Sequence, residues 1–183
     1  MSDSILMLPG IGNSGPLHWQ SLWEQSDPQI KRVQQRDWNN PICEEWVATL
    51  ELAVKQSGSH VVLVAHSLAC LVVAHWAVST HTAIDAALLV SVPDINGPNF
   101  PGVAKGFENA PSLPFNFKSA VVVSEDDPYG SPDHAVLLAH AWGSQVVNIG
   151  KHGHINASSG LGFWSEGYQL LNQLRVRPEK SRT

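Results

Sequence analysis

Short apolar runs alternate with longer amphipathic segments along the whole chain. Five of these runs predict strands, at residues 5–8, 61–64, 87–92, 120–124 and 145–149, and a segment interrupted by polar residues, at 30–35, predicts a further strand near an edge of the sheet. Apolar runs of this length, bounded by small or turn-forming residues, are typical of strands buried in a parallel sheet. Because helical patterns separate the runs, the sequence predicts an α/β fold.

The helical patterns fill the gaps between these strands. Trp19 and Trp23 recur at helical spacing. A second helix is expected to open at Asn40 and Pro41, with asparagine as its cap and proline in its first turn, and to end at Gly58. Further helices are expected at residues 68–79, 131–142 and 164–174.

Residues 93–117 fit neither pattern. This segment is rich in proline, glycine and asparagine, and it carries phenylalanine at positions 100, 107, 115 and 117. A loop of this length without secondary structure is uncommon unless it has a function. It is either a lid or wall of a substrate site, or a surface loop anchored by its aromatic side chains.

The run at residues 61–64 leads into Ala65-His66-Ser67-Leu68-Ala69, and a helical pattern begins at once. This order indicates a nucleophile elbow, the sharp turn that lifts a serine above the carboxyl edge of a sheet. The usual motif has glycine two residues before and two residues after the serine. Alanine, the next smallest residue, holds both positions here. The other interpretation is that Ser67 only caps the following helix.

A glycine-rich loop at residues 9–15 follows the first strand. Its glycines match the letters of the G-x-G-x-x-G dinucleotide motif, but His18 and Trp19 crowd the place where a helix should open on phosphate. A dinucleotide site also needs an acidic residue at the end of a strand about 20 residues further on, and none stands clearly at that distance; Asp37 is the nearest candidate. We therefore expect no cofactor. The alternative is that the loop supplies a backbone N–H group, most simply that of Ile11, to an oxyanion hole.

Three strand ends carry residue types that work together in nucleophilic catalysis. They are Ser67, the pair Asp126 and Asp127, and His154. The carboxyl ends of parallel strands lie at one edge of a sheet, and the order Ser, Asp, His is that of α/β hydrolases. Serine needs a base, histidine can accept and return a proton near pH 7, and a carboxylate holds the imidazole in one tautomer. Backbone N–H groups of Ile11 and Leu68 would then bind the developing oxyanion.

Other histidines near these residues have competing interpretations. His152 and His154 could form a metal-binding pair, but no third ligand has motif spacing, so no metal is expected. His66 is expected to pack or to form a hydrogen bond rather than to act as the base. His18 and Trp19 follow the glycine-rich loop and are expected to line the pocket, although Trp19 could equally lie in the core.

Five groups of residues match the motifs of one known family. They are Leu8-Pro9-Gly10 with His18-Trp19, Asp37-Trp38 with Pro41 and Glu45-Trp46, Ala65-His66-Ser67-Leu68, Asp126-Asp127-Pro128-Tyr129, and Gly153-His154-Ile155-Asn156 with Ser159-Gly160. Through them the chain resembles the α/β-hydrolase superfamily, and more closely the small bacterial serine hydrolases related to retinoblastoma-binding protein 9. The alanines at the elbow depart from the motif.

The resemblance implies a compact α/β-hydrolase fold that lacks the first two strands of larger relatives. Its six-stranded parallel sheet would have the order 2-1-3-4-5-6, with helices on both faces. The resemblance favours Asp127, which precedes a proline, over Asp126 as the acid, and His154, which follows a glycine, as the base. The resemblance thus implies a serine hydrolase without a cofactor. Such an enzyme would cleave a small carboxylic ester or related acyl substrate through an acyl-enzyme.

The alternative hypothesis is a non-enzymatic function, in which a protein with the hydrolase fold binds a protein partner and keeps a vestigial triad. The namesake of the family motivates this alternative, and the presence of all three triad residue types counts against it.

Composition narrows the possible partners and location. The 183 residues, 43% of them hydrophobic, suffice for one domain over residues 1–183, with a frayed tail at residues 175–183. A net charge of −5 without charge blocks argues against nucleic acid and acidic membranes as partners. Cys43 and Cys70 lie in apolar patterns, and the first residues contain no secretion signal, so we expect a cytoplasmic protein.

Overall fold

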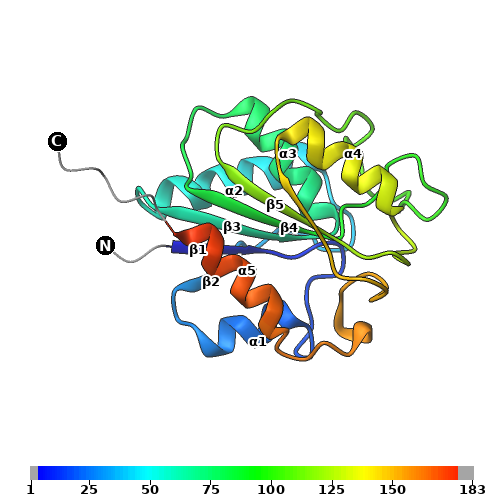
Figure 1. Ribbon diagram of the computed structural model, residues 1–183. Coiled ribbons are helices and arrows are strands. Elements are labelled where there is room, and N and C mark those ends of the chain that lie inside the picture. The colour runs from blue at the N-terminus through cyan, green and yellow to red at the C-terminus, as the bar shows by residue number, and fades with distance from the viewer. Residues whose placement is uncertain (1–3, 177–183) are drawn as a thin grey trace.

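Six parallel strands form a single sheet in the order β2-β1-β3-β4-β5-β6 (Figure 1). The computed structural model describes residues 4–176. The strands are β1 (Ser4–Leu8), β2 (Ile30–Arg32), β3 (Val61–His66), β4 (Ala86–Val90), β5 (Lys118–Val123) and β6 (Gln145–Asn148). Every pair of neighbouring strands is parallel. The expected fold class and strand order are confirmed.

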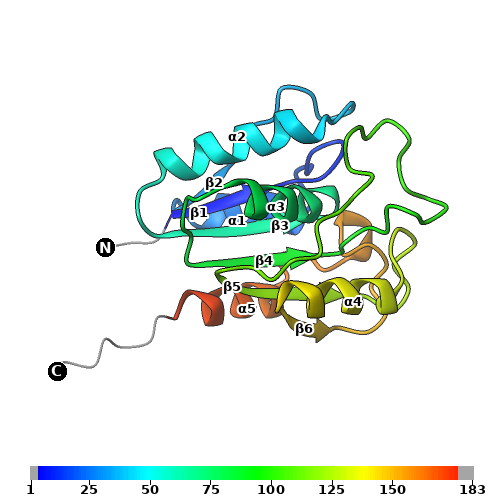
Figure 2. The same cartoon turned by 90° about the horizontal axis from the view of Figure 1, so that it is seen from above.

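Helices cover both faces of the sheet (Figures 1 and 2). They are α1 (Trp19–Ser26), α2 (Cys43–Gln56), α3 (Leu68–Ser79), α4 (Pro132–Trp142) and α5 (Ser165–Arg175), with a short 3₁₀ helix η1 (Ala157–Ser159). Buried side chains of α2, α3 and α4 pack on one face, and those of α1 and α5 pack on the other. This cover on both sides explains why all residues of β3 and β4 are buried and why their sequences are apolar throughout.

The start of α2 differs from the sequence-based expectation. The helix begins at Cys43, because Ile42 pairs with Lys105 in an isolated parallel bridge and keeps the preceding backbone extended. The Lys105 N–H donates to the carbonyl of Pro41 at 3.0 Å, and the Cys43 N–H donates to the carbonyl of Lys105 at 2.9 Å. Asn40 does not cap the helix, since its side-chain and backbone N–H groups both donate to the carboxylate of Asp37.

Other boundaries shift by a few residues. The edge strand β2 ends at Arg32 instead of residue 35, and β5 begins two residues earlier than expected, at Lys118. Arg175, expected in a frayed tail, is the last residue of α5, whereas residues 177–183 lie outside the described part of the chain. Cys43 and Cys70 are unpaired and buried. No helix among residues 4–176 is both long and apolar enough to cross a membrane.

Candidate active site

Ser67 lies in a sharp turn between β3 and α3. Its φ and ψ angles are 58° and −129°, a conformation that costs a residue with a side chain on the order of 1–3 kcal/mol. The backbone N–H of Ser67 donates to the carbonyl of Val90 in the neighbouring strand at 2.9 Å, which helps to hold the turn. Ala65 and Ala69 are both buried, so alanine is small enough for this turn. The hydroxyl of Ser67 makes no capping bond to α3.

The hydroxyl instead belongs to a chain of hydrogen bonds with a histidine and an aspartate. Ser67 Oγ lies 2.8 Å from His154 Nε2. His154 Nδ1 lies 2.9 Å and 3.0 Å from the two carboxylate oxygens of Asp127. The side chain of Asp127 is only 3% exposed and that of His154 is 10% exposed, so water screens this pair weakly. The structure therefore brings together the serine, histidine and aspartate that the sequence singled out.

Asp126, the alternative to Asp127 as the acid, is exposed to solvent. Its Oδ1 accepts from the backbone N–H of Gly153 at 2.7 Å and from the Ser124 hydroxyl at 3.0 Å. The hydrogen bond from Gly153 is the main reason that the pKa of Asp126 is lowered. The Ser124 hydroxyl in turn accepts from the N–H of His152. Asp126 thus holds the loop that carries His154 without touching the imidazole.

Two further histidines lie near His154: His66 packs against it, and His18 packs against His66. His66 lies 4.9 Å from His154 between ring centroids, and His66 Nε2–H donates to the backbone carbonyl of His154 at 2.8 Å. Burial lowers the pKa of His66 well below its usual value, and the neighbouring His154 and His18 add to this effect. Burial also lowers the pKa of His18 to about 4, with contributions from Arg32 and His154. Both rings are therefore neutral near pH 7.

The glycine-rich loop approaches the turn at Ser67 closely. A Cβ atom at Gly10 would lie 2.9 Å from Ser67 Cβ and 3.1 Å from the carbonyl oxygen of His66. Neither Ile11 N–H nor Leu68 N–H has a hydrogen-bond acceptor among residues 4–176. Both residues line the cavity at Ser67, so these two N–H groups are available for an oxyanion.

A network of buried polar side chains lies under this loop, and it is not predicted by the sequence analysis. Gln20 is fully buried, donates to the carbonyls of Leu8 and Val64, and accepts from the Ser14 hydroxyl at 2.6 Å. Arg32 donates to Asn13 Oδ1 at 2.7 Å and to the carbonyl of Ser14 at 2.9 Å. A glutamine directly after the buried Trp19, on a helix packed against the sheet, was the signal that could have revealed this network.

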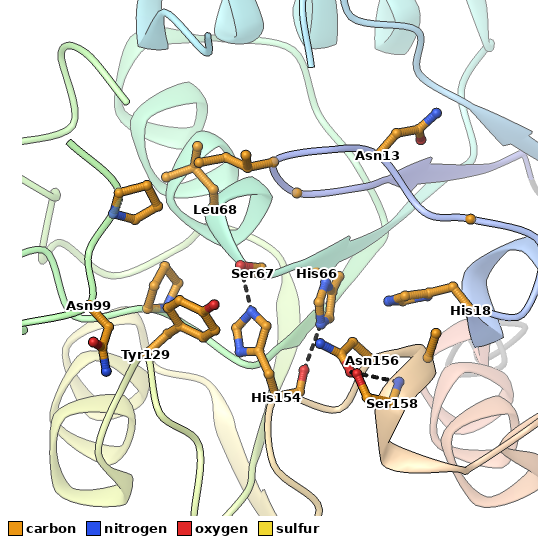
Figure 3. A pocket seen from close by; sticks show the side chains of 16 residues that line it. Asn13, His18, His66, Ser67, Leu68, Asn99, Tyr129, His154, Asn156 and Ser158 are labelled. Atoms are coloured by element: carbon orange, nitrogen blue, oxygen red, sulfur yellow. Dashed lines mark hydrogen bonds between the residues drawn. The ribbon is translucent and has the colours of Figure 1, made fainter. Parts of the chain in front are cut away.

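A cavity of about 580 Å³ opens at Ser67 (Figure 3). His18, Asn156 and Ser158 lie on one side of Ser67, and Asn99 and Tyr129 lie on the other. The complete lining is Gly10, Ile11, Asn13, Gly15, His18, His66, Ser67, Leu68, Pro93, Asn99, Pro101, Tyr129, His154, Asn156, Ala157 and Ser158.

His18 lines this cavity as expected, but Trp19 does not. The Trp19 side chain is 1% exposed, and its indole N–H donates to the carbonyl of Ile155 at 2.7 Å. Trp19 lies in the core, where it supports the loop that follows His154.

Residues 93–117 contribute one wall and are also anchored. Pro93, Asn99 and Pro101 line the cavity, whereas Phe107 is completely buried in the core. The amide of Asn99 donates to the carbonyl of Pro128 at 2.7 Å, which ties the segment to the loop that carries Asp127.

Cofactor and metal sites were the other interpretations of these loops. The glycine-rich loop does not open a helix, since α1 begins only at Trp19 with His18 as its cap. No group of three or more His, Cys, Asp or Glu side chains that could hold a metal ion occurs among residues 4–176.

Comparisons with known proteins agree with this architecture. Residues 5–173 match the family described as serine hydrolase. A structure from Pectobacterium atrosepticum, described as a YdeN-like hydrolase, is 28% identical with a TM-score of 0.85, covering 94% of this chain and 90% of its own. The ydeN gene product of B. subtilis is 19% identical with a TM-score of 0.76, covering 94% and 98%.

Est1E from Butyrivibrio proteoclasticus, solved with ferulic acid, is 14% identical with a TM-score of 0.68, covering 96% and 90%. At 14% and 19% identity the likeness shows the α/β-hydrolase fold alone. A search of curated proteins gave no match. Since the family match covers nearly the whole described chain, this protein belongs to the serine hydrolase family.

Proposed function

We propose that this serine hydrolase cleaves a small carboxylic ester, or a related acyl bond, through an acyl-enzyme on Ser67. The observation that carries the proposal is the unbroken hydrogen-bond chain from Asp127 through His154 to Ser67, which ends in a cavity. Such a chain activates a serine that is a weak nucleophile by itself.

In the acylation step, His154 Nε2 takes the proton of Ser67 Oγ as that oxygen attacks the ester carbonyl carbon. The carbonyl oxygen becomes an oxyanion and accepts hydrogen bonds from the N–H groups of Ile11 and Leu68. When the tetrahedral intermediate collapses, the bond to the leaving alcohol breaks. His154 then gives its proton to the departing alkoxide.

Deacylation repeats these steps with water as the nucleophile. His154 takes a proton from the water, which attacks the acyl carbon, and then returns that proton to Ser67 Oγ. The products are the carboxylic acid and the free enzyme. Throughout, Asp127 accepts from Nδ1–H of His154 and stabilises its charged form. Because the lowered pKa values of His66 and His18 keep these rings neutral, neither adds a competing positive charge at pH 7.

The test combines active-site labelling with turnover. We expect a fluorophosphonate probe to label the wild-type protein at Ser67, and p-nitrophenyl acetate to be hydrolysed. Ser67→Ala should show neither, with circular dichroism and the thermal unfolding midpoint as controls for folding. Wild-type turnover by Ser67→Ala would refute the proposal. A folded wild-type protein that neither reacts nor turns over would refute it too, and would favour the alternative of a non-catalytic module that binds a protein partner.

A further inference from the structure

The side chain of Asn156 has a fixed orientation in the cavity. Its Oδ1 accepts from the backbone N–H of Ser158 at 2.9 Å and from the Ser158 hydroxyl at 3.0 Å. A backbone N–H can only donate, so the oxygen of the amide must face Ser158 and the nitrogen must face away. The backbone of Asn156 is held as well, because its N–H donates to Ser159 Oγ at 3.0 Å. The orientation of Nδ2 is therefore set by η1, the 3₁₀ helix that Asn156 caps.

Nδ2 of Asn156 is a donor without an acceptor. No residue among 4–176 accepts a hydrogen bond from it, although Asn156 is partly buried and lines the cavity. Figure 3 shows this amide nitrogen beside the ring of His66, next to the hydrogen bond from His66 to the carbonyl of His154, and Asn156 lines the same cavity as Ser67. A fixed, unpaired donor at this place can bind an acceptor on a substrate that reacts with Ser67.

A second unpaired donor lies on the same side of Ser67. His18 Nδ1 accepts from the backbone N–H of Gln20 at 3.2 Å, so the neutral ring carries its proton on Nε2. That nitrogen is buried and has no hydrogen-bond partner among residues 4–176. His18 as a whole is 5% exposed, so we assign direct contact with a ligand to Asn156 and treat His18 as the polar wall behind it.

The charge of the cavity restricts the kind of acceptor. Among the described residues, the lining contains no Lys, Arg, Asp or Glu side chain, and the whole chain has a net charge of −5. A carboxylate or phosphate on the substrate would be left without a cationic partner here, at a substantial cost in free energy. An ether, carbonyl or hydroxyl oxygen would satisfy a neutral amide donor without that cost.

We propose that Asn156 is a specificity-determining residue that binds an uncharged oxygen acceptor in either the acyl chain or the alcohol chain of the ester substrate. This assignment rests on the proposed function, because it places the acceptor on a substrate held at Ser67. The enzyme would then prefer an ester with an oxygen in one of its chains over the same ester with a methylene group at that position.

Two pairs of substrates test this preference, one for each chain of the ester. p-Nitrophenyl methoxyacetate is compared with p-nitrophenyl butyrate, and 2-methoxyethyl acetate with butyl acetate. In each pair, kcat/KM for the oxygen-containing ester is divided by kcat/KM for its methylene analogue. Dividing the wild-type ratio by the ratio of a variant cancels the difference in intrinsic reactivity between the two esters.

Two variants remove Nδ2 and keep an oxygen that can cap η1. Asn156→Ser retains an oxygen for the Ser158 N–H but has no Nδ2. Asn156→Asp has nearly the same shape and replaces the donor with an acceptor. In at least one substrate pair we expect the ratio to fall about tenfold in Asn156→Ser and further in Asn156→Asp. Asn148→Ser is the matched control, since Asn148 Oδ1 also accepts from the N–H two residues on, at 2.8 Å, outside the cavity.

The outcomes separate this inference from the proposed function. If Ser67→Ala is inactive but both ratios are the same in wild type and both Asn156 variants, Asn156 has no role in specificity and only the inference is overturned. Equal losses on both members of each pair would also overturn it, since they would indicate a structural role. If Ser67→Ala hydrolyses these esters like wild type, the proposed function and the inference both fail.

Discussion

Replacing Gly10 with alanine tests whether the approach of the glycine-rich loop to Ser67 matters for catalysis. The added Cβ would lie 2.9 Å from Ser67 Cβ, 3.1 Å from the carbonyl oxygen of His66 and 3.4 Å from the backbone nitrogen of Leu68. Ordinary contacts of this kind begin near 3.4 Å, so the loop and the turn must separate by about 0.5 Å. That shift moves Ile11 N–H relative to Leu68 N–H, the two expected oxyanion donors.

The expected size of the effect follows from the chemistry of such donors. Loss of one oxyanion-hole donor costs about 10²–10³ in kcat. We expect Gly10→Ala to lower kcat for p-nitrophenyl acetate by about that factor and to change KM much less, because the donors act mainly on the charge of the transition state. Crowding of the core can also lower stability by about 1–3 kcal/mol. Activity is therefore measured well below the thermal unfolding midpoint of each variant.

Gly102→Ala is the control for this substitution. Gly102 lies outside the cavity, its φ is not in the left-handed region, and a Cβ there would meet nothing within 4 Å. This variant should retain wild-type kcat. If Gly10→Ala is folded and its kcat lies within threefold of wild type, the close approach at Ser67 is not needed and the reasoning about the oxyanion hole is refuted.

Two further predictions concern the acidic pair and His18. Asp127→Asn should lower kcat by about 10⁴, whereas Asp126→Asn should lower it by about tenfold at most, because Asp126 only holds the loop of His154; equal losses would contradict this division. His18 has a folded-state pKa of about 4 against 6.5 when unfolded, so the unfolded chain binds more protons between these values and stability falls as pH drops from 6.5 to 4. Over that range His18 should lower the free energy of unfolding, measured in urea, by about 3 kcal/mol. His18→Asn, which retains a capping side chain, should lose less stability over the same range. An identical pH dependence of stability in both proteins would refute this role of His18.

The parts of the fold that depend on local pattern were predictable from the sequence. Apolar runs identified five of the six strands, a segment interrupted by polar residues identified β2, and the resemblance to α/β hydrolases supplied their order. The error at Asn40 and Pro41 has a long-range cause, since the bridge between Ile42 and Lys105 joins residues that are far apart in the sequence. Capping preferences cannot anticipate such a contact, because the loop of residues 93–117 has no pattern of its own.

The three residues brought together at the site were predictable for a similar reason. The residues that hold the surrounding loops in place were not. Ser67, Asp127 and His154 each follow a strand, and parallel strands end at one edge of the sheet, so order along the chain sufficed. The roles of Asn156, Gln20 and Asp126 depend on hydrogen bonds between separate loops. Each is a common polar residue type, and nothing in its immediate neighbourhood shows which partner it will have.

One turn of α1 connects three loops of the site that are far apart in the sequence. Gln20 ties together the ends of β1 and β3, from which the glycine-rich loop and the turn at Ser67 begin, through the carbonyls of Leu8 and Val64. The preceding residue, Trp19, holds the loop after His154 through the carbonyl of Ile155. Both side chains are buried, and the cost of leaving such groups unpaired fixes their orientation. The distances between Ser67, His154 and the expected oxyanion donors therefore depend on how α1 packs against the sheet. For that reason the two indoles at Trp19 and Trp23, which anchor α1 in the core, contribute to the geometry of the site without lining its cavity.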